Sequence, residues 1–274
     1  MSIYEHFRPD EVVFVDKVLE WKRAAEYHQV KLTDFLDPRQ QQIVTMVIGQ
    51  GDVAVQFDGA TSQAERKRAL IYPDYLVINE EEFQVEVLEI DYPSKFYTLE
   101  HRQILGTFMS LGLTREKCGD ILLQEDRAQI VVAKEVVSYI EMNLQSIGKV
   151  KVSLSPVQGE KILQIQETWG EKSGTVSSLR LDVMLAEMLH ISRQKVQPFI
   201  KNGLVKVNWK TVEQTSYECY PGDVFSVRGY GRSKLFSVEG RTKRDKWRIL
   251  YGILRRREQK KTSNGFTIRW ILRN

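Results

Sequence analysis

The sequence predicts an α+β protein made of several small domains, and three observations support this. The chain has 274 residues, which is long for one compact core when domains cluster near ~100–150 residues. Strand and helix periodicities between residues 83 and 157 follow the order βαββαβ. The charge changes sign near Ser178: residues 1–178 hold 19 basic and 28 acidic side chains, whereas residues 179–274 hold 21 and 8. We therefore expect more than one domain, with a polyanion as the partner of the basic C-terminal end.

The composition argues for a folded protein without a membrane segment. Hydrophobic residues make up 42% of the chain and charged residues 28%, which is ordinary for a globular protein. No run approaches ~18 apolar residues, and the segment MSIYEHFRPDE lacks the basic and apolar parts of an export signal. Cys118 and Cys219 lie about a hundred positions apart, which suits neither a disulfide framework nor a zinc site. We expect a cytoplasmic protein with reduced thiols, no metal and no cofactor.

Residues 1–78 are expected to form a helical region with a short strand. Apolar residues at helical spacing predict a helix over residues 10–29. Asp37 as N-cap and Pro38 at the first helical position predict a second helix. The segment DVAVQFDGA alternates like a strand, and AERKRALIYPDY predicts a helix that Pro73 ends. The basic cluster in this last segment is either a solvated helix face or a contact with RNA or protein; it comprises Arg66, Lys67 and Arg68.

Residues 79–160 are expected to form a ferredoxin-like domain of the RNA-recognition type. FQVEVLEIDY, DILLQ, AQIVVA and KVKVSLSPV alternate as strands, and TLEHRQILGTFMSLG and KEVVSYIEMNLQSIG have helical periodicity. This split-βαβ order hosts RNA-recognition modules and many unrelated functions. The third strand, RAQIVVAKE, lacks the aromatic residues that stack on bases, so we expect no RNA binding on the sheet face. Nearby cations are either plain surface or a contact with RNA or protein: Arg102, Arg115 and Lys117.

The rest of the chain divides into a linker, a basic domain and a tail. Residues 161–178 lose periodicity and end in Gly, Ser and Thr, which is typical of linkers. A domain is expected over residues 179–252, and it begins with a helix that carries an apolar stripe. Residues 253–274 form a basic tail without a pattern, which is compatible with disorder.

The segment SRQKVQPFIKNGLVKVN, in the basic domain, carries only positive charges. Ser192 is a suitable N-cap, and the pattern predicts a helix followed by a short strand. At ~100° per residue, Arg193, Gln197 and Lys201 share one helix edge beside the apolar face. No acidic residue lies within residues 189–211, although charged surfaces normally mix signs. Such a row of long donors grips phosphates and sugars without reading sequence.

The pattern RLDVMLAEMLHISRQKVQPFIKNGLVKVN, followed by PGDVFSVRGYGR, resembles the S4 domain, an RNA-binding fold named after a protein of the small ribosomal subunit. The match covers residues 179–238 and rests on RLD, SR, GLVKVN and GDVFSVRG. The resemblance implies a helix pair that packs on a small bent sheet and contacts structured RNA. Asp182 is expected to be a buried or capping partner rather than a ligand. Together, the charges and the resemblance give this RNA-binding set: Arg180, Ser192, Arg193, Lys195, Gln197, Lys201, Lys206, Asn208, Lys210, Arg228, Arg232 and Lys234.

Two residues depart from the pattern of S4 domains. Pro198 lies inside the second helix, where it removes one backbone donor and is expected to bend the helix. Trp209 stands where an Asn-Gly turn often has its glycine, so the hairpin need not be type I′. Trp209 either stacks on a base or a protein, or packs on its own hairpin.

Segments along nearly the whole chain resemble the YlmH family of Gram-positive bacteria, among them YEHFRPDE, ERKRALIYP, DYPSKFYTLEHRQILGTFMSLGL and RGYGRSK. The resemblance implies an acidic helical N-terminal region, a middle domain like an RNA-recognition module and an S4 domain, acting at the ribosome. It further implies binding to ribosomal RNA of the large subunit, with tRNA as a further partner, in ribosome-associated quality control of stalled nascent chains. We expect a monomer without a small-molecule substrate.

Catalysis is not expected, although S4 domains also occur in pseudouridine synthases and tyrosyl-tRNA synthetases. The first 170 residues contain no Gly-rich phosphate loop, no H-x-x-H ligand pair and no GxSxG motif. Asp91 lacks the basic setting of a pseudouridine synthase aspartate. The remaining alternative is a scaffold linked to cell division or to a membrane surface, which would use the basic tail; its segment TIRWILRN is short for that purpose.

Overall fold

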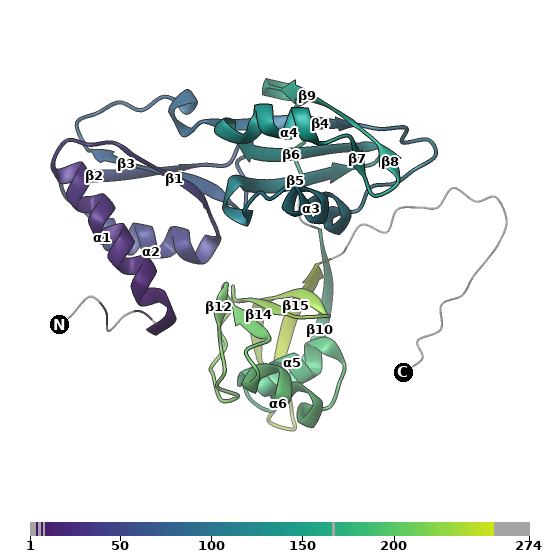
Figure 1. Ribbon diagram of the computed structural model, residues 1–274. Helices are drawn as coiled ribbons and strands as arrows, with labels where there is room; N and C mark the ends of the chain where they lie inside the picture. The colour runs from purple at the N-terminus through teal and green to yellow at the C-terminus, as the bar shows by residue number, and fades with distance from the viewer. Residues whose placement is uncertain (1–3, 5–6, 8, 166–167, 255–274) are drawn as a thin grey trace.

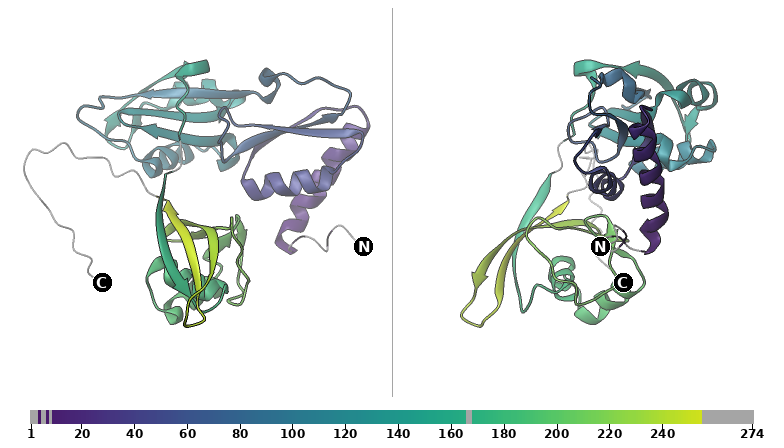
Figure 2. Two further views of the ribbon diagram at one scale, coloured as in Figure 1. Left: turned by 180° about the vertical axis from the view of Figure 1, so that it is seen from behind. Right: turned by 90° about the vertical axis from the view of Figure 1, so that its left-hand side faces the viewer.

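The computed structural model describes residues 4, 7, 9–165 and 168–254. Three larger sheets, each with its own helices, follow one another along the chain (Figure 1). The N-terminal and middle units lie side by side, and the C-terminal unit projects from them (Figures 1 and 2). None of the helices in the described residues is long and apolar enough to cross a membrane.

The N-terminal unit is an antiparallel sheet of order β1-β3-β2 that packs on two helices. Both predicted helices are confirmed. Asp37 accepts a 2.9 Å hydrogen bond from the Gln40 amide, and the Gln40 side chain accepts one from the Asp37 amide, which closes a capping box. The elements are α1 (Val12–Glu26), β1 (Lys31–Leu36), α2 (Pro38–Ile48), β2 (Val53–Asp58) and β3 (Lys67–Pro73).

The prediction of a helix in AERKRALIYPDY is wrong, because this segment forms the central strand β3. All residues of β3 after Lys67 are buried. A strand covered on both faces loses the polar-apolar alternation that identifies strands in a sequence, and a short apolar run does not distinguish strand from helix. The neighbouring strand β1 was not predicted either, since its burial is irregular.

The middle unit has the predicted βαββαβ order, and its sheet order is β5-β6-β4-β9 with antiparallel neighbours. The second helix ends earlier than expected, because the chain turns into a small hairpin around Gly148 (φ 60°). The elements are β4 (Val85–Asp91), α3 (His101–Ser110), β5 (Cys118–Gln124), β6 (Arg127–Ala133), α4 (Val137–Asn143), β7 (Ser146–Ile147), β8 (Val150–Lys151) and β9 (Ser153–Val157).

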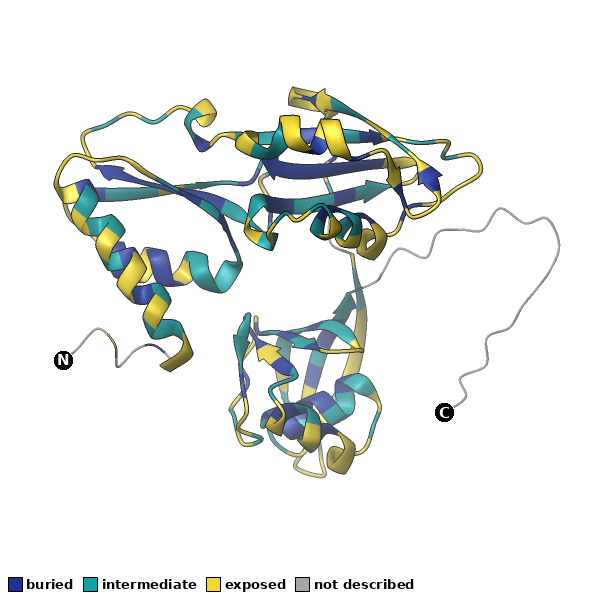
Figure 3. Cartoon of the chain, viewed as in Figure 1, coloured by how far each residue is buried: buried dark blue, intermediate teal, exposed yellow. Residues whose placement is uncertain are grey.

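The sheet face on which RNA-recognition modules usually bind RNA is covered here by the chain itself. Helices α3 and α4 cover one face of the middle sheet, and the other carries Val87, Val131 and their neighbours, which pack against Phe35 of β1 and Leu163. The buried Gln129 side chain accepts from the Leu163 amide at 2.8 Å. Strand β6 is consequently buried along almost its whole length (Figure 3).

Gly119 allows the N-terminal and middle units to approach each other closely. A Cβ atom at Gly119 would lie 2.9 Å from the Phe35 ring and 3.0 Å from Val131. Any side chain at this position would push β1 away from β5, so the contact between these units depends on glycine.

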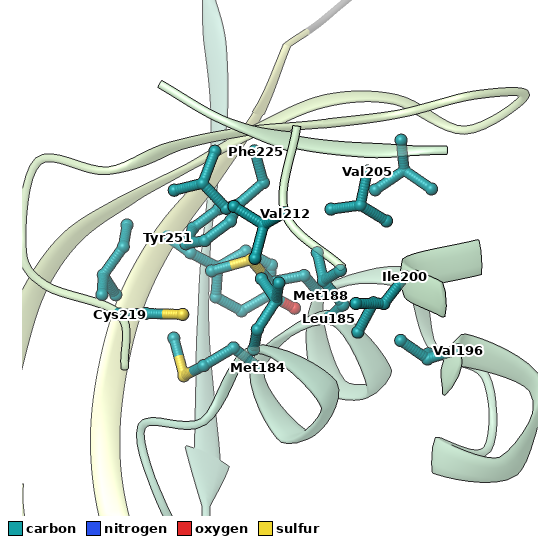
Figure 4. Packing of buried hydrophobic residues seen from close by; sticks show 14 of the residues in the cluster. Met184, Leu185, Met188, Val196, Ile200, Val205, Val212, Cys219, Phe225 and Tyr251 are labelled. Atoms are coloured by element: carbon teal, nitrogen blue, oxygen red, sulfur yellow. The ribbon is translucent and has the colours of Figure 1, made fainter. Parts of the chain in front are cut away.

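The C-terminal unit is a six-stranded sheet of order β10-β15-β14-β13-β11-β12 with two helices on one face. The helices contribute Met184, Leu185, Met188 and Ile200 to a core that includes Phe225 of the sheet (Figure 4). The elements are β10 (Trp169–Val176), α5 (Leu181–Leu189), α6 (Arg193–Lys201), β11 (Val205–Val207), β12 (Lys210–Thr211), β13 (Val224–Val227), β14 (Gly231–Arg241) and β15 (Trp247–Leu254).

The predicted linker over residues 161–178 is wrong in its larger part. Strand β10 occupies Trp169–Val176 and pairs with β15 along its whole length, so the C-terminal unit begins before residue 179. The segment TSYECY forms an isolated bridge between Glu218 and Arg180. Of the predicted tail, residues 253 and 254 belong to β15, and residues 255–274 lie outside the described residues.

The two departures from the S4 pattern have specific outcomes. Helix α6 continues past Pro198 to Lys201, and Gly203 follows it at φ 67°, a conformation common just after a helix end. Asn208 and Trp209 form a two-residue loop between β11 and β12 with φ of 48° and 64°. Positive φ at both positions is the type I′ arrangement, which forms here although tryptophan replaces glycine.

Candidate nucleic-acid interface

Helices α5 and α6 lie on the side of the C-terminal unit that points away from the other two units (Figure 1). The inner side of each helix is buried, and the outer side of α6 is exposed (Figure 3). The predicted RNA-binding residues of both helices are thus open to a large partner, with no other described part of this chain in front of them.

A single buried carboxylate, that of Asp182, organises three of these residues. Asp182 is 0% exposed, as the prediction of a buried partner requires. Its Oδ2 accepts from Arg193 Nε at 2.7 Å and from Gln197 Nε2 at 3.4 Å. Its Oδ1 accepts from Arg180 Nε at 3.2 Å. Side chains from the start of α5 and the first half of α6 are therefore fixed around one anion.

The protonation of Asp182 follows from these contacts. Burial alone would raise the pKa of this carboxyl, but hydrogen bonds from Arg180, Arg193 and Gln197 outweigh burial and lower the pKa. Asp182 therefore remains an anion at neutral pH. The side chains of Arg180 and Arg193 are still 41% and 50% exposed, so each can donate to a second anion on its solvent side.

Three further predicted residues on α6 face solvent. Lys195 and Lys201 are exposed, and no ion pair holds either side chain within the described residues. Ser192 occupies the N-cap position, but its hydroxyl makes no capping hydrogen bond and is exposed. The α6 surface consequently presents two free ammonium groups and a hydroxyl beside the Asp182 cluster.

The predicted residues on the strands have different roles. Asn208 is a structural residue: its Nδ2 donates to Asp223 Oδ1 at 2.7 Å, and its Oδ1 accepts from the Val224 amide at 2.9 Å. Lys210 lies on the edge strand β12 and pairs with Val207. Arg228 is exposed just after β13, where its amide donates to Leu204 O beside the end of α6.

The remaining predicted residues lie on the opposite face of the sheet from the helices. Lys206 pairs with Ser226, which pairs with Arg232, and paired residues share a face. Lys234 lies two residues further along β14, where it pairs with Val224 and so shares the face of Arg232. The structure therefore divides the predicted set between two faces of the C-terminal unit.

Arg232 and Lys234 face the N-terminal unit across a cleft of about 290 Å³. Arg232 Nη1 donates to Glu65 Oε2 from the N-terminal unit. The cleft is also lined by Lys67 and by two half-buried tryptophans, Trp169 and Trp209. The sequence indicated Trp209 as a candidate contact, whereas Trp169 was missed because it lay in the predicted linker.

The cations proposed as a secondary contact are mostly engaged inside the protein. Arg68 is 4% exposed and donates to Thr33 O, Gln84 O and the Glu135 carboxylate. Arg66 and Arg115 likewise donate to backbone carbonyl oxygens, those of Phe35 and Cys118 for Arg66 and those of Cys118 and Gly119 for Arg115. Lys117 forms ion pairs with Asp34 and Glu135. The other two are more accessible, since Lys67 lines the cleft and Arg102 is exposed on α3.

The two cysteines carry no reactive chemistry in this arrangement. Both are buried and free, and burial raises the pKa of Cys219 to about 12. A thiol with that pKa stays protonated and is a poor nucleophile and metal ligand at neutral pH.

Family models match the chain in three consecutive parts. They are described as "YlmH, N-terminal" over residues 10–76, "Putative RNA-binding domain in YlmH" over residues 79–161 and "S4 domain" over residues 179–225. A relative from Bacillus subtilis (strain 168), ribosome-associated protein quality control protein P2, is 45% identical over 251 residues, which is 91% of this chain and 98% of that protein. The match therefore spans nearly the whole of both proteins.

Two other matches are more limited. An uncharacterized RNA pseudouridine synthase from Aquifex aeolicus (strain VF5) is 41% identical over 51 residues, which is 19% of this chain and 21% of that protein. The solved structure of the cell division protein ylmH from Streptococcus pneumoniae is 34% identical, with a TM-score of 0.49, and covers 57% of this chain and 96% of that one.

Proposed function

Since this chain belongs to the YlmH family, we propose that it is a non-catalytic protein that binds structured RNA on the large ribosomal subunit. Its role there is in the quality control of stalled nascent chains. The Bacillus subtilis relative, which is named for ribosome-associated quality control, supports the ribosomal setting. The proposal also includes a cytoplasmic location, a monomeric state and contact with tRNA as well as ribosomal RNA.

The observation that carries this proposal is the cluster around Asp182. One buried anion holds Arg180, Arg193 and Gln197 in place, while Lys195 and Lys201 extend the same surface. Guanidinium groups fixed in this way lose little conformational entropy when they bind phosphate. Because these donors contact phosphates and sugars rather than base edges, the surface selects an RNA shape more than a sequence.

The test is co-sedimentation of the protein with purified large and small ribosomal subunits. We compare the wild type with an Arg193→Ala, Lys201→Ala variant and with an Arg23→Ala, Lys31→Ala control, which removes the same charge from exposed positions of the N-terminal unit. The wild type and the control should pellet with the large subunit, and the helix variant should not. If the wild type pellets with neither subunit, the ribosomal proposal fails, and a role linked to cell division becomes the leading alternative.

Salt dependence gives a second test of the same proposal. About five phosphate contacts predict an affinity loss of roughly 100- to 500-fold between 50 and 200 mM salt. A nearly flat dependence would contradict binding through phosphates. The pseudouridine synthase match does not argue for that reaction here, because it covers 19% of this chain.

A further inference from the structure

The hairpin that joins β14 to β15 is the most densely charged segment of the described chain outside the predicted RNA-binding set. Its sequence over residues 241–248 is RTKRDKWR, with five cations and one acid. None of these residues belongs to the surface around Asp182. Figure 2 shows the hairpin projecting from the C-terminal unit in the right-hand view.

Internal contacts hold the turn of this hairpin in one conformation. The Thr242 amide donates to Lys246 O at 2.7 Å, and the Asp245 amide donates to Thr242 O at 2.9 Å. Arg241 is bound internally, because its guanidinium lies 4.5 Å from the centre of the Trp247 ring and donates to Asp245. Trp247 in turn packs against the core of the C-terminal unit. The turn is therefore anchored to the domain rather than loosely attached.

Three cations of the turn have no such internal role. Lys243, Arg244 and Lys246 are exposed, and no carboxylate of the described residues forms an ion pair with them. Arg241 and Asp245, the other charged residues of the turn, neutralise each other. The turn thus carries three exposed positive charges within four residues, an arrangement that costs repulsion unless an anion binds there.

The hairpin starts beside the helix surface proposed to bind RNA. Trp247 pairs with Val176, the last residue of β10, and Arg180 of the Asp182 cluster follows Val176 after four residues. The tip of the hairpin and the α5–α6 pair both lie at the end of the C-terminal unit that is remote from the other units (Figures 1 and 2). A single extended polyanion can therefore contact both.

We propose that the β14–β15 hairpin is a second phosphate-binding element that contacts the same double-helical RNA as the α5–α6 surface, an inference that rests on the proposed RNA-binding function. Lys243, Arg244 and Lys246 bind backbone phosphates and do not read the sequence. RNA is favoured over a lipid surface, because residues 242–246 contain no apolar side chain that could enter a bilayer.

The experiment measures binding of the full-length protein to a fluorescent RNA duplex of about 20 base pairs by anisotropy over a series of salt concentrations. The hairpin variant is Lys243→Gln, Arg244→Gln, Lys246→Gln. The matched control, Lys17→Gln, Arg23→Gln, Lys31→Gln, removes the same charge from exposed positions of the N-terminal unit. At 0.1 M salt the hairpin variant should bind roughly 100-fold more weakly, and its salt slope should fall by about 2 to 3, since each phosphate contact contributes about 0.7–0.9. In the control, the affinity and the salt slope should change only by the small amount that the loss of long-range charge attraction produces.

A third variant separates failure of this inference from failure of the proposed function. Lys195→Gln with Lys201→Gln alters α6 alone. If the α6 variant loses affinity and the hairpin variant matches the control, the hairpin inference is overturned and the proposed function stands. If the wild type does not bind the duplex, both fail. Vesicles with 30% anionic lipid are the remaining arm: wild-type binding to them that the hairpin variant loses, with RNA binding unchanged, would assign the hairpin to a membrane instead.

Discussion

The cations of the first two units and those of the C-terminal unit serve opposite purposes. In the N-terminal and middle units, Arg68 and Lys117 are bound to Glu135 and neighbouring groups, and they connect the two sheets. In the C-terminal unit, Arg180 and Arg193 share one buried anion yet remain about half exposed, and Lys195 and Lys201 are exposed. The donors of Arg68 and Lys117 are thus used within the protein, whereas these four residues of the basic part keep donors exposed to solvent.

The comparison shows that a local excess of one charge is more informative than a basic cluster by itself. The run Arg66 to Arg68 is as basic as any stretch of α6, but it lies among carboxylates and carbonyl oxygens that accept its hydrogen bonds. The α6 region has no acid in its own sequence, and the carboxylate that accepts from its Arg193 and Gln197 is supplied by α5. The predictions below test this division, beginning with the largest effect.

Arg68→Met should lower the free energy of unfolding by about 3 kcal/mol, because it removes a buried guanidinium that donates to Thr33 O, Gln84 O and the Glu135 carboxylate. Chemical denaturation measures this change. RNA affinity of the folded protein should stay at the wild-type value. A loss below about 1 kcal/mol would mean that Arg68 does not stabilise the contact between the first two units.

Lys195→Gln with Lys201→Gln should give the reverse result. RNA affinity at 0.1 M salt should fall about 50-fold, since two phosphate contacts are lost, and the unfolding free energy should change by less than about 0.5 kcal/mol, as for other exposed positions. Anisotropy and denaturation on the same preparation measure both quantities. An unchanged affinity would remove α6 from the proposed interface.

Asp182→Asn should change both the stability of the protein and its affinity for RNA. It should cost about 2 kcal/mol of stability at pH 7, because a buried carboxylate that accepts from two arginines becomes a neutral amide. The folded-state pKa of Asp182 is lowered, so its contribution is present above the unfolded pKa of about 3.9 and is lost as the pH falls through the lower folded-state pKa. The stabilities of the wild type and the variant should therefore begin to approach each other near pH 4 and converge at more acidic pH.

The same substitution distinguishes positioning from general attraction. Asp182→Asn removes one negative charge from the domain, which by itself would strengthen RNA binding. If Asp182 positions Arg180 and Arg193, the affinity should instead fall about 10-fold. An affinity above that of the wild type would show that the orientation of these arginines does not matter.

The smallest effect is expected for the ion pair between units. Arg232 and Glu65 have side chains 29% and 38% exposed, and exposed pairs contribute about 0.2–1 kcal/mol. A double-mutant cycle with Arg232→Gln and Glu65→Gln should give a coupling in that range. A coupling above about 2 kcal/mol would place this pair with the structural cations of the first two units.

The parts of the fold that the sequence predicted are those with local signals. The capping residues Asp37 and Pro38, the βαββαβ alternation and the S4 motifs each act within a few residues. Strand β3 is not predicted because both of its faces are buried. Strand β10 is not predicted because its sequence, WGEKSGTV, has the composition of a linker and forms a strand only by pairing with β15. The roles of neighbours across the chain, such as Glu135 for Arg68 and Glu65 for Arg232, depend on contacts that no local pattern records.

The candidate site divides in the same way. Asp182 was expected to be buried, because its motif is local, but its bonds to Arg193 and Gln197 appear only when α5 packs on α6. Asn208 is predicted to bind RNA, and the structure adds a role that the sequence did not indicate, since its side chain donates to Asp223 at the β11–β12 turn. The charge run RTKRDKWR is visible in the sequence, but it lies beyond residues 179–238, to which the resemblance to S4 domains extends.

The pairing of β10 with β15 also determines when the C-terminal unit can form during synthesis. These strands are the first and last of that sheet, they pair along their length, and about 70 residues separate them. Closure of such a loop is a non-local and comparatively slow step. A growing chain that has passed α6 but has not reached β15 contains every described element of the first two units. Its helices α5 and α6 still lack β15, which completes the sheet on which they pack. Of the three described units, the one that carries the proposed RNA-binding surface is therefore the last to be completed as the chain is made.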